Sequence, residues 1–356
     1  MDIFIFPFIT AAAITLLSVP LIIRLARRYG LVDDPKKRYH PANTHSGIIP
    51  RAGGAAIAAG IIGAGLWYLS PSPQVYGIYI GAVLVVAVGL WDDVVDLSPY
   101  LRLLLNFLAA GIVVWSGVMT PFITNPFGGV FHLDQFSFTV SLLGSEYQFF
   151  LFSILFSLLW IVWMMNAVGW SAGVDGQFPG FVAIASIVIA ILSQRLAASD
   201  VSQTLVTELS MITAGAFIGF LYWNFYPQKI MPGYGGKSLA GFMLAILSIL
   251  SGAKVGTALL VLGVPLIDAF YTILRRILKG QSPFRADRGH LHHLLLDLGW
   301  GKRRIAFFYW GITAFLGVIA LTLQSPQKLF VFLFLFVVIG AVLATVRLFD
   351  FFRVVS

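Results

Sequence analysis

The sequence contains no cysteine and few charged residues. None of its 356 residues is Cys, which excludes a disulfide framework and thiolate chemistry. Charged residues make up 11% of the chain, against roughly 25% in a soluble globular domain. Hydrophobic residues make up 59%, and the mean hydropathy is +0.90. So few charges cannot cover a soluble core of this size. The composition therefore excludes a soluble enzyme, a disordered chain and a nucleic-acid-binding domain, and indicates a membrane protein.

Acidic residues are scarcer than basic ones. The chain has 15 Asp and Glu against 23 Lys and Arg, which gives a formal net charge of +8. In a membrane protein such an excess usually reflects cytoplasmic loops and contact with anionic lipid headgroups. The N-terminus lacks the basic region and the small-residue cleavage site of a signal peptide, so we interpret it as a retained first span.

Eleven apolar stretches are long enough, or nearly so, to cross about 30 Å of hydrocarbon. They lie near residues 3–23, 52–69, 76–91, 101–119, 149–168, 178–193, 205–224, 238–253, 255–274, 305–323 and 329–346. We find no internal repeat or linker between them. The sequence therefore predicts an all-α polytopic membrane protein with about 11 transmembrane helices, in which residues 1–356 form one integral-membrane domain.

The basic residues predict the orientation of these spans. If the N-terminus lies outside, 20 of the 23 Lys and Arg residues lie on the inner side, and only Arg195, Lys254 and Lys328 lie outside. Cytoplasmic loops carry the excess of Lys and Arg in membrane proteins. We therefore expect a multi-pass protein of the cell (inner) membrane, with its N-terminus outside and its C-terminus cytoplasmic. The outer loop 120–148 has no Lys or Arg, and we expect it to form a hairpin.

Three carboxylates cluster at the inner end of the third predicted span. Asp92 and Asp93 are adjacent, and Asp96 follows one helical turn later. Such charges repel one another unless a cation lies between them, and hard oxygen ligands suit Mg²⁺, with Mn²⁺ as an alternative ion. The cluster predicts a metal site, although a solvated helix end would show the same pattern.

The largest inner loop carries three histidines within four residues. His290, His292 and His293 lie beside Arg288, and on a helix His290 and His293 would share a face. One interpretation is recognition of a nucleotide diphosphate. A zinc site is an alternative, although the chain has no Cys and no His-Glu-x-x-His pattern here. A solvated basic loop without a role is the third interpretation.

Three further inner segments have unusual composition. Loop 24–51 is basic, as a topology signal would be, but it leads into Gly53 and Gly54, which indicate close backbone approach. The segment from Asn166 to Gly176 holds one carboxylate, Asp175, among glycines, which favours a tight turn that aims a single ligand. Residues 231–238 are Gly-rich but lack the spacing of a nucleotide triphosphatase loop.

Asp268 lies inside the ninth predicted span, within Val264-Pro265-Leu266-Ile267-Asp268. An ionisable residue inside a span is a functional candidate by default. Arg275 and Arg276 follow two turns later, so a structural Asp–Arg pair is the alternative.

Taken in order along the chain, these motifs resemble those of the polyprenyl-phosphate N-acetylhexosamine-1-phosphate transferase family. The resemblance covers about residues 20–300, and the charge count places all of its motifs on the inner side independently. The motifs are the basic loop with Pro50-Arg51-Ala52-Gly53-Gly54, Asp92-Asp93-Val94-Val95-Asp96, the segment 166–176, Val264-Pro265-Leu266-Ile267-Asp268, and Asp287-Arg288-Gly289-His290-Leu291-His292-His293.

The resemblance implies a Mg²⁺-dependent enzyme that transfers a sugar-1-phosphate from a UDP-N-acetylhexosamine to polyprenyl (undecaprenyl) phosphate and releases UMP. This is a first membrane step of cell-wall or surface-glycan synthesis. The implied catalytic residues are Asp92, Asp93 and Asp175, and the implied metal ligands are these three with Asp96 and Asp268. The implied substrate-binding residues are Lys36, Lys37, Arg38, His40, Asn166, Lys237, Arg288, His290, His292 and His293. The expected partners are the lipid, the UDP-sugar and the membrane, without nucleic acid, and a homodimer is left open.

The chain departs from the family pattern at two places. Gly169 and Ala172 replace an Asn and an Asp of the motif that holds Asp175. No acidic residue lies between Glu208 and Asp268, where the family has a metal-ligating Asp near Gly233. We interpret Lys237 as a cation that supplies part of the missing charge neutralisation.

The sequence leaves two other functions open. One is a noncatalytic member of the family that binds lipid phosphate or nucleotide. The other is a small-molecule transporter, which would have polar or broken spans near the bilayer midplane and internal repeats. The polar residues of this chain instead gather at the inner interface, which favours the transferase.

Overall fold

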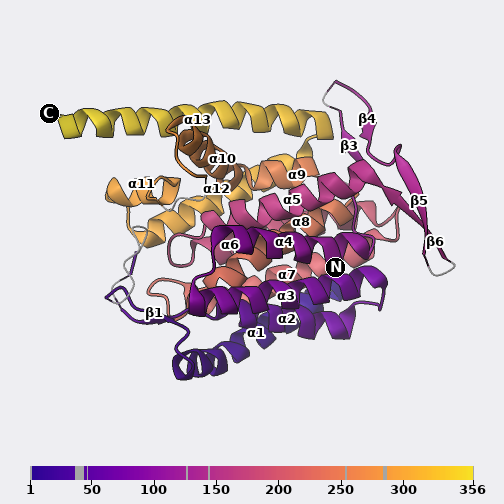
Figure 1. Ribbon diagram of the computed structural model, residues 1–356, viewed down its shortest axis with the longest axis horizontal. Coiled ribbons are helices and arrows are strands. Elements are labelled where there is room, and N and C mark those ends of the chain that lie inside the picture. The colour runs from indigo at the N-terminus through magenta and orange to yellow at the C-terminus, as the bar shows by residue number, and fades with distance from the viewer. Residues whose placement is uncertain are drawn as a thin grey trace.

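The computed structural model describes residues 2–36, 44–45, 47–125, 127–142, 145–252, 255–283 and 287–355. Within these residues the chain forms thirteen α-helices and six short strands (Figure 1). The helices are α1 (Asp2–Arg28), α2 (Gly53–Tyr68), α3 (Pro73–Val95), α4 (Pro99–Trp115), α5 (Leu151–Trp170), α6 (Gln177–Leu196), α7 (Gln203–Asn224), α8 (Gly233–Leu250), α9 (Val255–Val261), α10 (Gly263–Leu278), α11 (Leu291–Asp297), α12 (Lys302–Thr322) and α13 (Ser325–Val355). The strands are β1 (Val32–Asp33), β2 (Ile49–Pro50), β3 (Phe122–Thr124), β4 (Val130–His132), β5 (Ser137–Leu142) and β6 (Ser145–Phe150).

The all-α polytopic membrane fold is confirmed, and a helix occupies each predicted span. The ninth span is divided between α9 and α10, which meet at an angle of 83°. In the described part of the chain, eight helices are long and apolar enough to cross a membrane, or nine if α9 and α10 form one span. The apolar helices α2 and α4 are shorter, with 16 and 17 residues. The number of spans, the positions of the termini and the single-domain organisation stay predictions.

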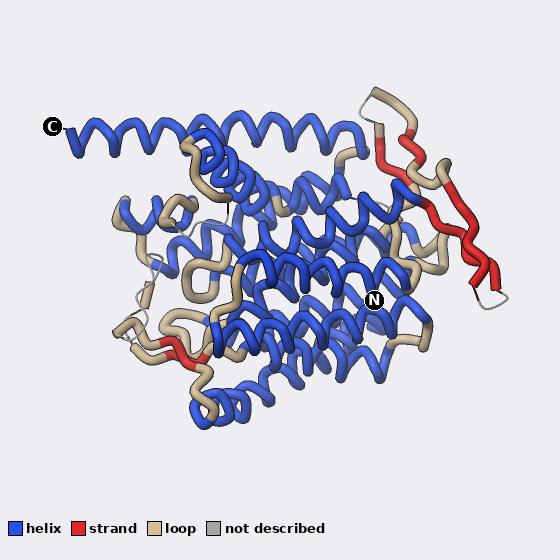
Figure 2. The backbone as a smooth tube through the Cα atoms, in the orientation of Figure 1, coloured by secondary structure: helices blue, strands red, loops and turns tan. Residues whose placement is uncertain are grey.

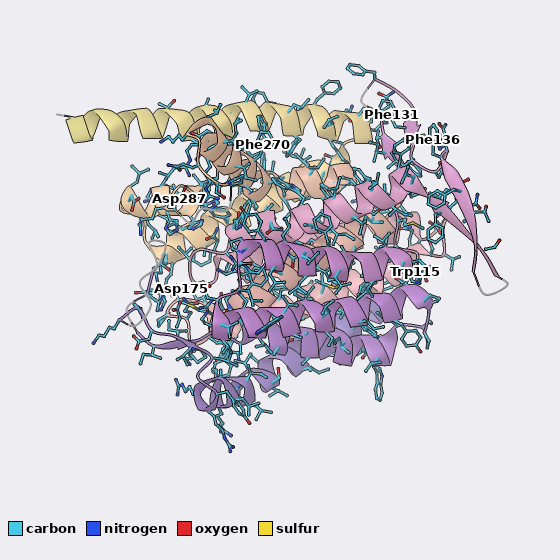
Figure 3. The ribbon with its side chains drawn as sticks, viewed as in Figure 1. Trp115, Phe131, Phe136, Asp175, Phe270 and Asp287 are labelled. Carbon is cyan, nitrogen blue, oxygen red and sulfur yellow. The ribbon has the colours of Figure 1, made fainter. Side chains whose placement is uncertain are left out.

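Most of the long helices run side by side, and the two ends of the bundle differ (Figures 1 and 2). One end carries the antiparallel hairpins β3–β4 and β5–β6, so the expected hairpin in loop 120–148 is present. The other end carries α11 and the short antiparallel pair β1–β2. In Figure 3, Asp175 and Asp287 lie at this second end, whereas Trp115, Phe131 and Phe136 lie at the hairpin end. Two of the predicted inner motifs therefore occupy the end opposite the predicted outer loop.

Helix α8 forms the centre of the bundle. It packs against α3 on one side and α5 on another, and its residues from Ser238 to Ile249 are buried on every face. A helix that is apolar all round is stable only when neighbours cover it completely. The beginning of α8 is thereby fixed at the end of the bundle where α3 ends.

Glycines allow this close approach of α2 and α3 to α8. A methyl group on Gly54 would overlap the backbone of Gly236, and one on Gly89 would overlap the backbone of Gly235. Small residues of this kind let helix backbones pack closely in membranes. The predicted close approach at Gly53 and Gly54 is confirmed, because the N–H groups of Gly53 and Gly54 donate to the carbonyls that immediately precede α8, at 3.0 and 2.9 Å.

The contact between α3 and α8 gives a prediction about stability. Gly89→Ala should lower the free energy of unfolding by about 1–3 kcal/mol, because the added methyl group forces the two helices apart. Gly111→Ala is the matched control, since Gly111 lies in α4 and a methyl group there would meet no atom within 4 Å. Thermal unfolding of both variants in detergent measures the difference, and equal stability of Gly89→Ala and the unaltered chain would contradict the packing.

The two ends of the bundle give a prediction about orientation. The chain has no Cys, so single cysteines can be introduced without removing others. Ser282→Cys and Ser137→Cys both place a thiol at an exposed position, at opposite ends of the bundle. A membrane-impermeant maleimide should label Ser282→Cys only from the cytoplasmic side and Ser137→Cys only from outside. Labelling from the reverse side at either position would overturn the predicted orientation.

Candidate active site

A cavity of about 450 Å³ lies at the end of the bundle that holds the predicted inner motifs. Its lining comes from the segment before α2, the adjoining ends of α3 and α4, the end of α5, the turn before α6, residues 224–238, and residues 276–293. The polar side chains that line it are Asp33, Thr44, His45, Arg51, Asp92, Asp96, Arg102, Asn166, Asn224, Gln228, Tyr234, Lys237, Ser238, Arg276, Asp287, His290, His292 and His293. Residues far apart in the sequence therefore meet in one polar site.

The structure brings part of the predicted site together in this cavity. The predicted residues that line it are Asp92, Asp96, Asn166, Lys237, His290, His292 and His293. Of the other predicted residues within the described ranges, Lys36, Asp93, Asp175, Asp268 and Arg288 do not line it. Lys36 is exposed, and Arg288 forms a surface ion pair with Asp297 at 2.7 Å. Lys37, Arg38 and His40 lie outside the described residues.

Asp92 and Asp93 have separate cationic partners, although they are adjacent at the end of α3. Nη1 of Arg102 lies 3.3 Å from Oδ1 of Asp92, and Nη2 of Arg51 lies 2.8 Å from Oδ1 of Asp93. The two carboxylate side chains are 2% and 1% exposed. A carboxylate buried this deeply needs a charged or hydrogen-bonding partner. The two arginines offset the repulsion between these carboxylates. The sequence pattern led us to expect a metal ion in this role.

The turn after α3 aims Asp92 and Asp96 at the cavity. Asp96 adopts the left-handed conformation, with φ of 56°, which Asp tolerates better than most residues. The N–H of Leu97 then donates to Oδ1 of Asp92 at 3.0 Å. Arg102 in the next helix also lies over the ring of Tyr234, 5.1 Å from its centre. The sequence did not indicate Arg102, because its position at the start of a predicted span marks only a membrane boundary.

Asp175 is bound by residues from two other segments. Nζ of Lys302, the first residue of α12, lies 2.9 Å from its Oδ1, and Gln228 donates to it from its backbone N–H and from Nε2, each at 3.2 Å. These contacts tie the turn before α6 to α12 and to the segment after α7. Lys302 lies beyond the region of resemblance, and no motif indicated it. The catalytic and metal roles of Asp175 stay predictions.

Asp268 is fully buried and pairs with a histidine instead of an arginine. Its Oδ2 lies 2.8 Å from Nδ1 of His290, and its Oδ1 accepts the N–H of Leu291 at 2.8 Å. The expected alternative, an Asp268–Arg pair, is wrong. A carboxylate on Nδ1 fixes the orientation of the His290 ring, which lines the cavity.

Asp287, and not Asp268, is the carboxylate that pairs with Arg275 and Arg276. Nη2 of Arg275 and Nε of Arg276 lie 2.6 and 3.2 Å from its Oδ2, and the N–H of Gly289 donates to Oδ1 at 2.7 Å. Partial burial acts to raise the pKa of Asp287, but these hydrogen bonds and the two guanidinium charges outweigh it and lower the pKa to about 2. Asp287 is therefore ionised at neutral pH and anchors the loop before the histidines.

His292 and His293 are neutral imidazoles at neutral pH. Burial, with smaller effects from His293 and His290, lowers the pKa of His292 well below its usual value. Burial, followed by the charge of Arg288, lowers the pKa of His293 to about 4. The rings of His290 and His292 are stacked at 5.7 Å, and those of His292 and His293 lie 4.3 Å apart. Within the described part of the chain, Nδ1 of His292 and of His293 has no hydrogen-bond partner. These two rings therefore offer neutral donors and acceptors to a ligand, and not positive charge.

His45 and Arg51 are the basic residues of loop 24–51 that line the cavity, among the residues that the structure describes. The side chain of His45 is 4% exposed, both ring nitrogens are buried without a hydrogen-bond partner among the described residues, and Nε2 lies 4.0 Å from Oδ2 of Asp33. The hydroxyl of Thr44 donates to the carbonyl of Gly173 at 3.2 Å, which joins this loop to the segment that holds Asp175. His45 was one of several basic residues in the loop, and its sequence neighbours gave no reason to select it.

Two glycines in the cavity wall cannot be replaced without displacing functional groups. A methyl group on Gly173 would overlap the ring of His292. Gly233 has φ of +66°, and a methyl group there would overlap the carbonyl of Arg51 and the carboxylate of Asp93. An acidic side chain at position 233 is therefore excluded, and Tyr234, which follows it, lines the cavity.

The chain is similar in sequence to known proteins over most of its length. The family described as glycosyl transferase family 4 matches residues 75–252. A decaprenyl-phosphate N-acetylglucosaminephosphotransferase of Mycobacterium tuberculosis is 33% identical over 342 residues, which cover 86% of this chain and 80% of that protein. The chain belongs to glycosyl transferase family 4.

Other relatives of this family-4 transferase carry related names. The "Probable undecaprenyl-phosphate N-acetylglucosaminyl 1-phosphate transferase" of Bacillus subtilis is 29% identical over 328 residues, or 89% of this chain and 84% of that protein. The undecaprenyl-phosphate alpha-N-acetylglucosaminyl 1-phosphate transferase of Escherichia coli is 28% identical over 297 residues, or 79% of this chain and 73% of that protein.

The carboxylates of this family-4 transferase do not form the predicted metal site. Among the described residues, no three Asp, Glu or His side chains lie together in a group that could hold a metal ion. Asp92, Asp93, Asp175 and Asp268 are each bound to a cationic side chain or an imidazole. The residues present therefore do not fit a metal ion held by the protein alone. Dependence of the reaction on Mg²⁺ stays a prediction.

The neutral histidines give a prediction about pH. An unfolded His has a pKa of about 6.5, whereas His293 in the folded protein has a pKa of about 4. Between these values the unfolded state binds a proton that the folded state does not, so stability falls as the pH is lowered from about 6.5 to about 4. The loss from His293 is of the order of 3 kcal/mol.

Thermal unfolding of His293→Gln across this pH range measures the effect. His293 faces Arg288, His290, Asp297 and Asp268, which are unchanged in the variant. The variant should show a shallower fall in stability towards low pH than the unaltered chain. His132→Gln is the matched control, because that ring is half exposed at the hairpin end. Identical slopes for His293→Gln and the unaltered chain would contradict a buried neutral His293.

Proposed function

We propose that this chain transfers N-acetylhexosamine-1-phosphate from a UDP-N-acetylhexosamine to a polyprenyl phosphate. An oxygen of the lipid phosphate forms a bond to the sugar-bearing phosphorus, the bond from that phosphorus to the UMP oxygen breaks, and polyprenyl-diphospho-sugar and UMP result. The observation that carries the proposal is the single cavity in which four cations and four histidines meet beside apolar helices. The names of the relatives, which are transferases of N-acetylglucosamine phosphate to polyprenyl phosphates, support it.

The charge of the cavity suits two phosphorylated substrates. Phosphoryl transfer depends mainly on positioning and on electrostatic stabilisation of charge spread over phosphate oxygens. Arg51, Arg102, Lys237 and Arg276 supply positive charge around the cavity. The neutral rings of His292 and His293 add hydrogen-bonding groups without further charge. The site therefore has separate means to neutralise phosphates and to orient the uncharged parts of a nucleotide sugar.

The bend between α9 and α10 supports a lipid acceptor. Beyond the bend, α10 exposes Phe270, Leu274 and Ile277, which are 45%, 42% and 55% exposed. Figure 3 labels Phe270 on this helix. Its last turn carries Arg276, which lines the cavity. A polyprenyl chain lying on the apolar side of α10 would thus bring its phosphate to the cavity while its tail stays in the bilayer. A transporter also has broken helices, but the ionisable groups of this site gather at one end of the bundle.

Orientation and localisation follow the same proposal. The positive-inside count supports a cavity that opens to the cytoplasmic side of the cell (inner) membrane. Asp92 and Asp96 line the cavity, but Asp92 is engaged by Arg102, so the proposal assigns no step to a metal ion held by these carboxylates. A homodimer stays a prediction.

Release of UMP from UDP-N-acetylglucosamine, measured with the full chain in detergent, undecaprenyl phosphate and Mg²⁺, tests the function. Asp92→Asn should lower kcat on the order of 100-fold or more, because it removes a cavity carboxylate and frees Arg102. Asp93→Asn should also lower the free energy of unfolding, by about 3–5 kcal/mol, because it leaves Arg51 without its buried partner. Asp134→Asn, at the exposed hairpin end, is the control and should change neither.

Two outcomes would count against the proposal. No UMP release with any UDP-sugar of a panel would favour the noncatalytic alternative. Full activity of Asp92→Asn would show that the reaction does not depend on the Asp92 carboxylate.

A further inference from the structure

Lys237 brings an ammonium group to the cavity without an acidic partner. It is the fifth residue of α8 and lines the cavity. Among the residues that the structure describes, its side chain forms neither a hydrogen bond nor an ion pair, although Asp92 and Asp93 lie at the nearby end of α3 and Asp33 lines the same cavity. Asp93 is already neutralised by Arg51, and Asp92 by Arg102. The charge of Lys237 is therefore left for a ligand.

The space beside Lys237 is open because residue 169 has no side chain. A methyl group on Gly169 would lie 3.6 Å from Cβ of Lys237, in ordinary van der Waals contact, so any longer side chain there would cover the stem of the lysine. Gly169 lines the cavity at the end of α5, opposite the beginning of α8. No side chain at position 169 therefore covers the stem of Lys237 where both residues line the cavity.

The same space is unsuited to a divalent cation. A metal ion there would meet the ammonium of Lys237 and the guanidinium groups of Arg51 and Arg102, while Asp92 and Asp93 are engaged by those arginines. Mg²⁺ needs carboxylate or phosphate oxygens that are free to coordinate. A diphosphate, in contrast, gains from each of these positive charges, because an ammonium group binds phosphate as a point charge.

We propose that Lys237 is the binding site for the diphosphate of the nucleotide donor, and that it gives this chain affinity for a nucleoside diphosphate without any metal ion. The ammonium group contacts the diphosphate oxygens directly, with Arg51 and Arg102 as the charges behind it. The inference rests on the proposed function, because it takes the donor to be a nucleoside diphosphate sugar. In this proposal Lys237 neutralises the diphosphate in the role that the sequence analysis gave to a metal ion.

Binding of UDP and of uridine to the full chain in detergent, measured by titration calorimetry in EDTA, tests this inference. The unaltered chain should bind UDP more tightly than uridine under these conditions. Lys237→Met keeps the length of the side chain and removes the charge, so it should weaken UDP binding roughly ten- to hundredfold. It should leave uridine binding unchanged, which also shows that the variant is folded. Lys237→Arg should retain most of the UDP affinity.

Lys279→Met is the matched control, since Lys279 is exposed just after α10 and does not line the cavity. Equal UDP affinity of Lys237→Met and the unaltered chain would overturn the inference. So would a chain that binds UDP no better than uridine in EDTA and gains UDP affinity only with Mg²⁺. In both cases the nucleotide still binds, so the proposed function survives. Failure to bind UDP with or without Mg²⁺ would instead overturn the proposed function and this inference with it.

Discussion

The paired arginine–carboxylate contacts at the end of α3 determine how the site is built. Asp92 and Asp93 are buried at a membrane-spanning helix end, where an unpaired charge is costly. Each is satisfied by an arginine from a different element, Arg102 of α4 and Arg51 of the segment before α2. These pairs hold three elements around the first turn of α8, and the glycine contacts of α2 and α3 let that turn approach. Among the described residues, Lys237 is left as the positive group that faces the cavity without a partner.

The site consequently divides into parts with different chemistry. Arginines and Lys237 supply positive charge near the ends of α3 and α8. The histidines of α11 and the residue before it supply neutral rings, with His290 oriented by the fully buried Asp268. Asp287 anchors the loop between them through Arg275 and Arg276. A substrate with both a diphosphate and uncharged hydrogen-bonding groups matches this division, as a nucleotide sugar does.

Much of the fold and part of the site could be predicted from the sequence. Continuous apolar runs located every long helix, because a helix in lipid must satisfy its own backbone and present apolar side chains. Gly53 and Gly54 predicted close approach, since only glycine permits it. Pairings were harder to predict, because they depend on tertiary contacts between distant segments. Asp175 and Lys302 are separated by 127 positions, and nothing near Lys302 marked it.

Charge states could not be predicted from residue type. The histidine cluster indicated recognition of a nucleotide diphosphate without giving the charge of its rings, and burial keeps His292 and His293 neutral. The carboxylate cluster indicated a metal site, whereas Arg51 and Arg102, which lie outside the cluster, neutralise Asp93 and Asp92. In both cases the deciding quantity is the surroundings of a buried group, which the sequence does not contain.

A structure of the full chain in lipid nanodiscs with bound UDP-N-acetylglucosamine would test most directly whether this cavity is the donor site. We expect density for the nucleotide sugar within the cavity, with its diphosphate beside Nζ of Lys237 and its uncharged groups towards His290 and His292. Density for the nucleotide at the hairpin end, or in the cavity with the diphosphate away from Lys237 on a metal ion held by Asp92 and Asp93, would contradict it.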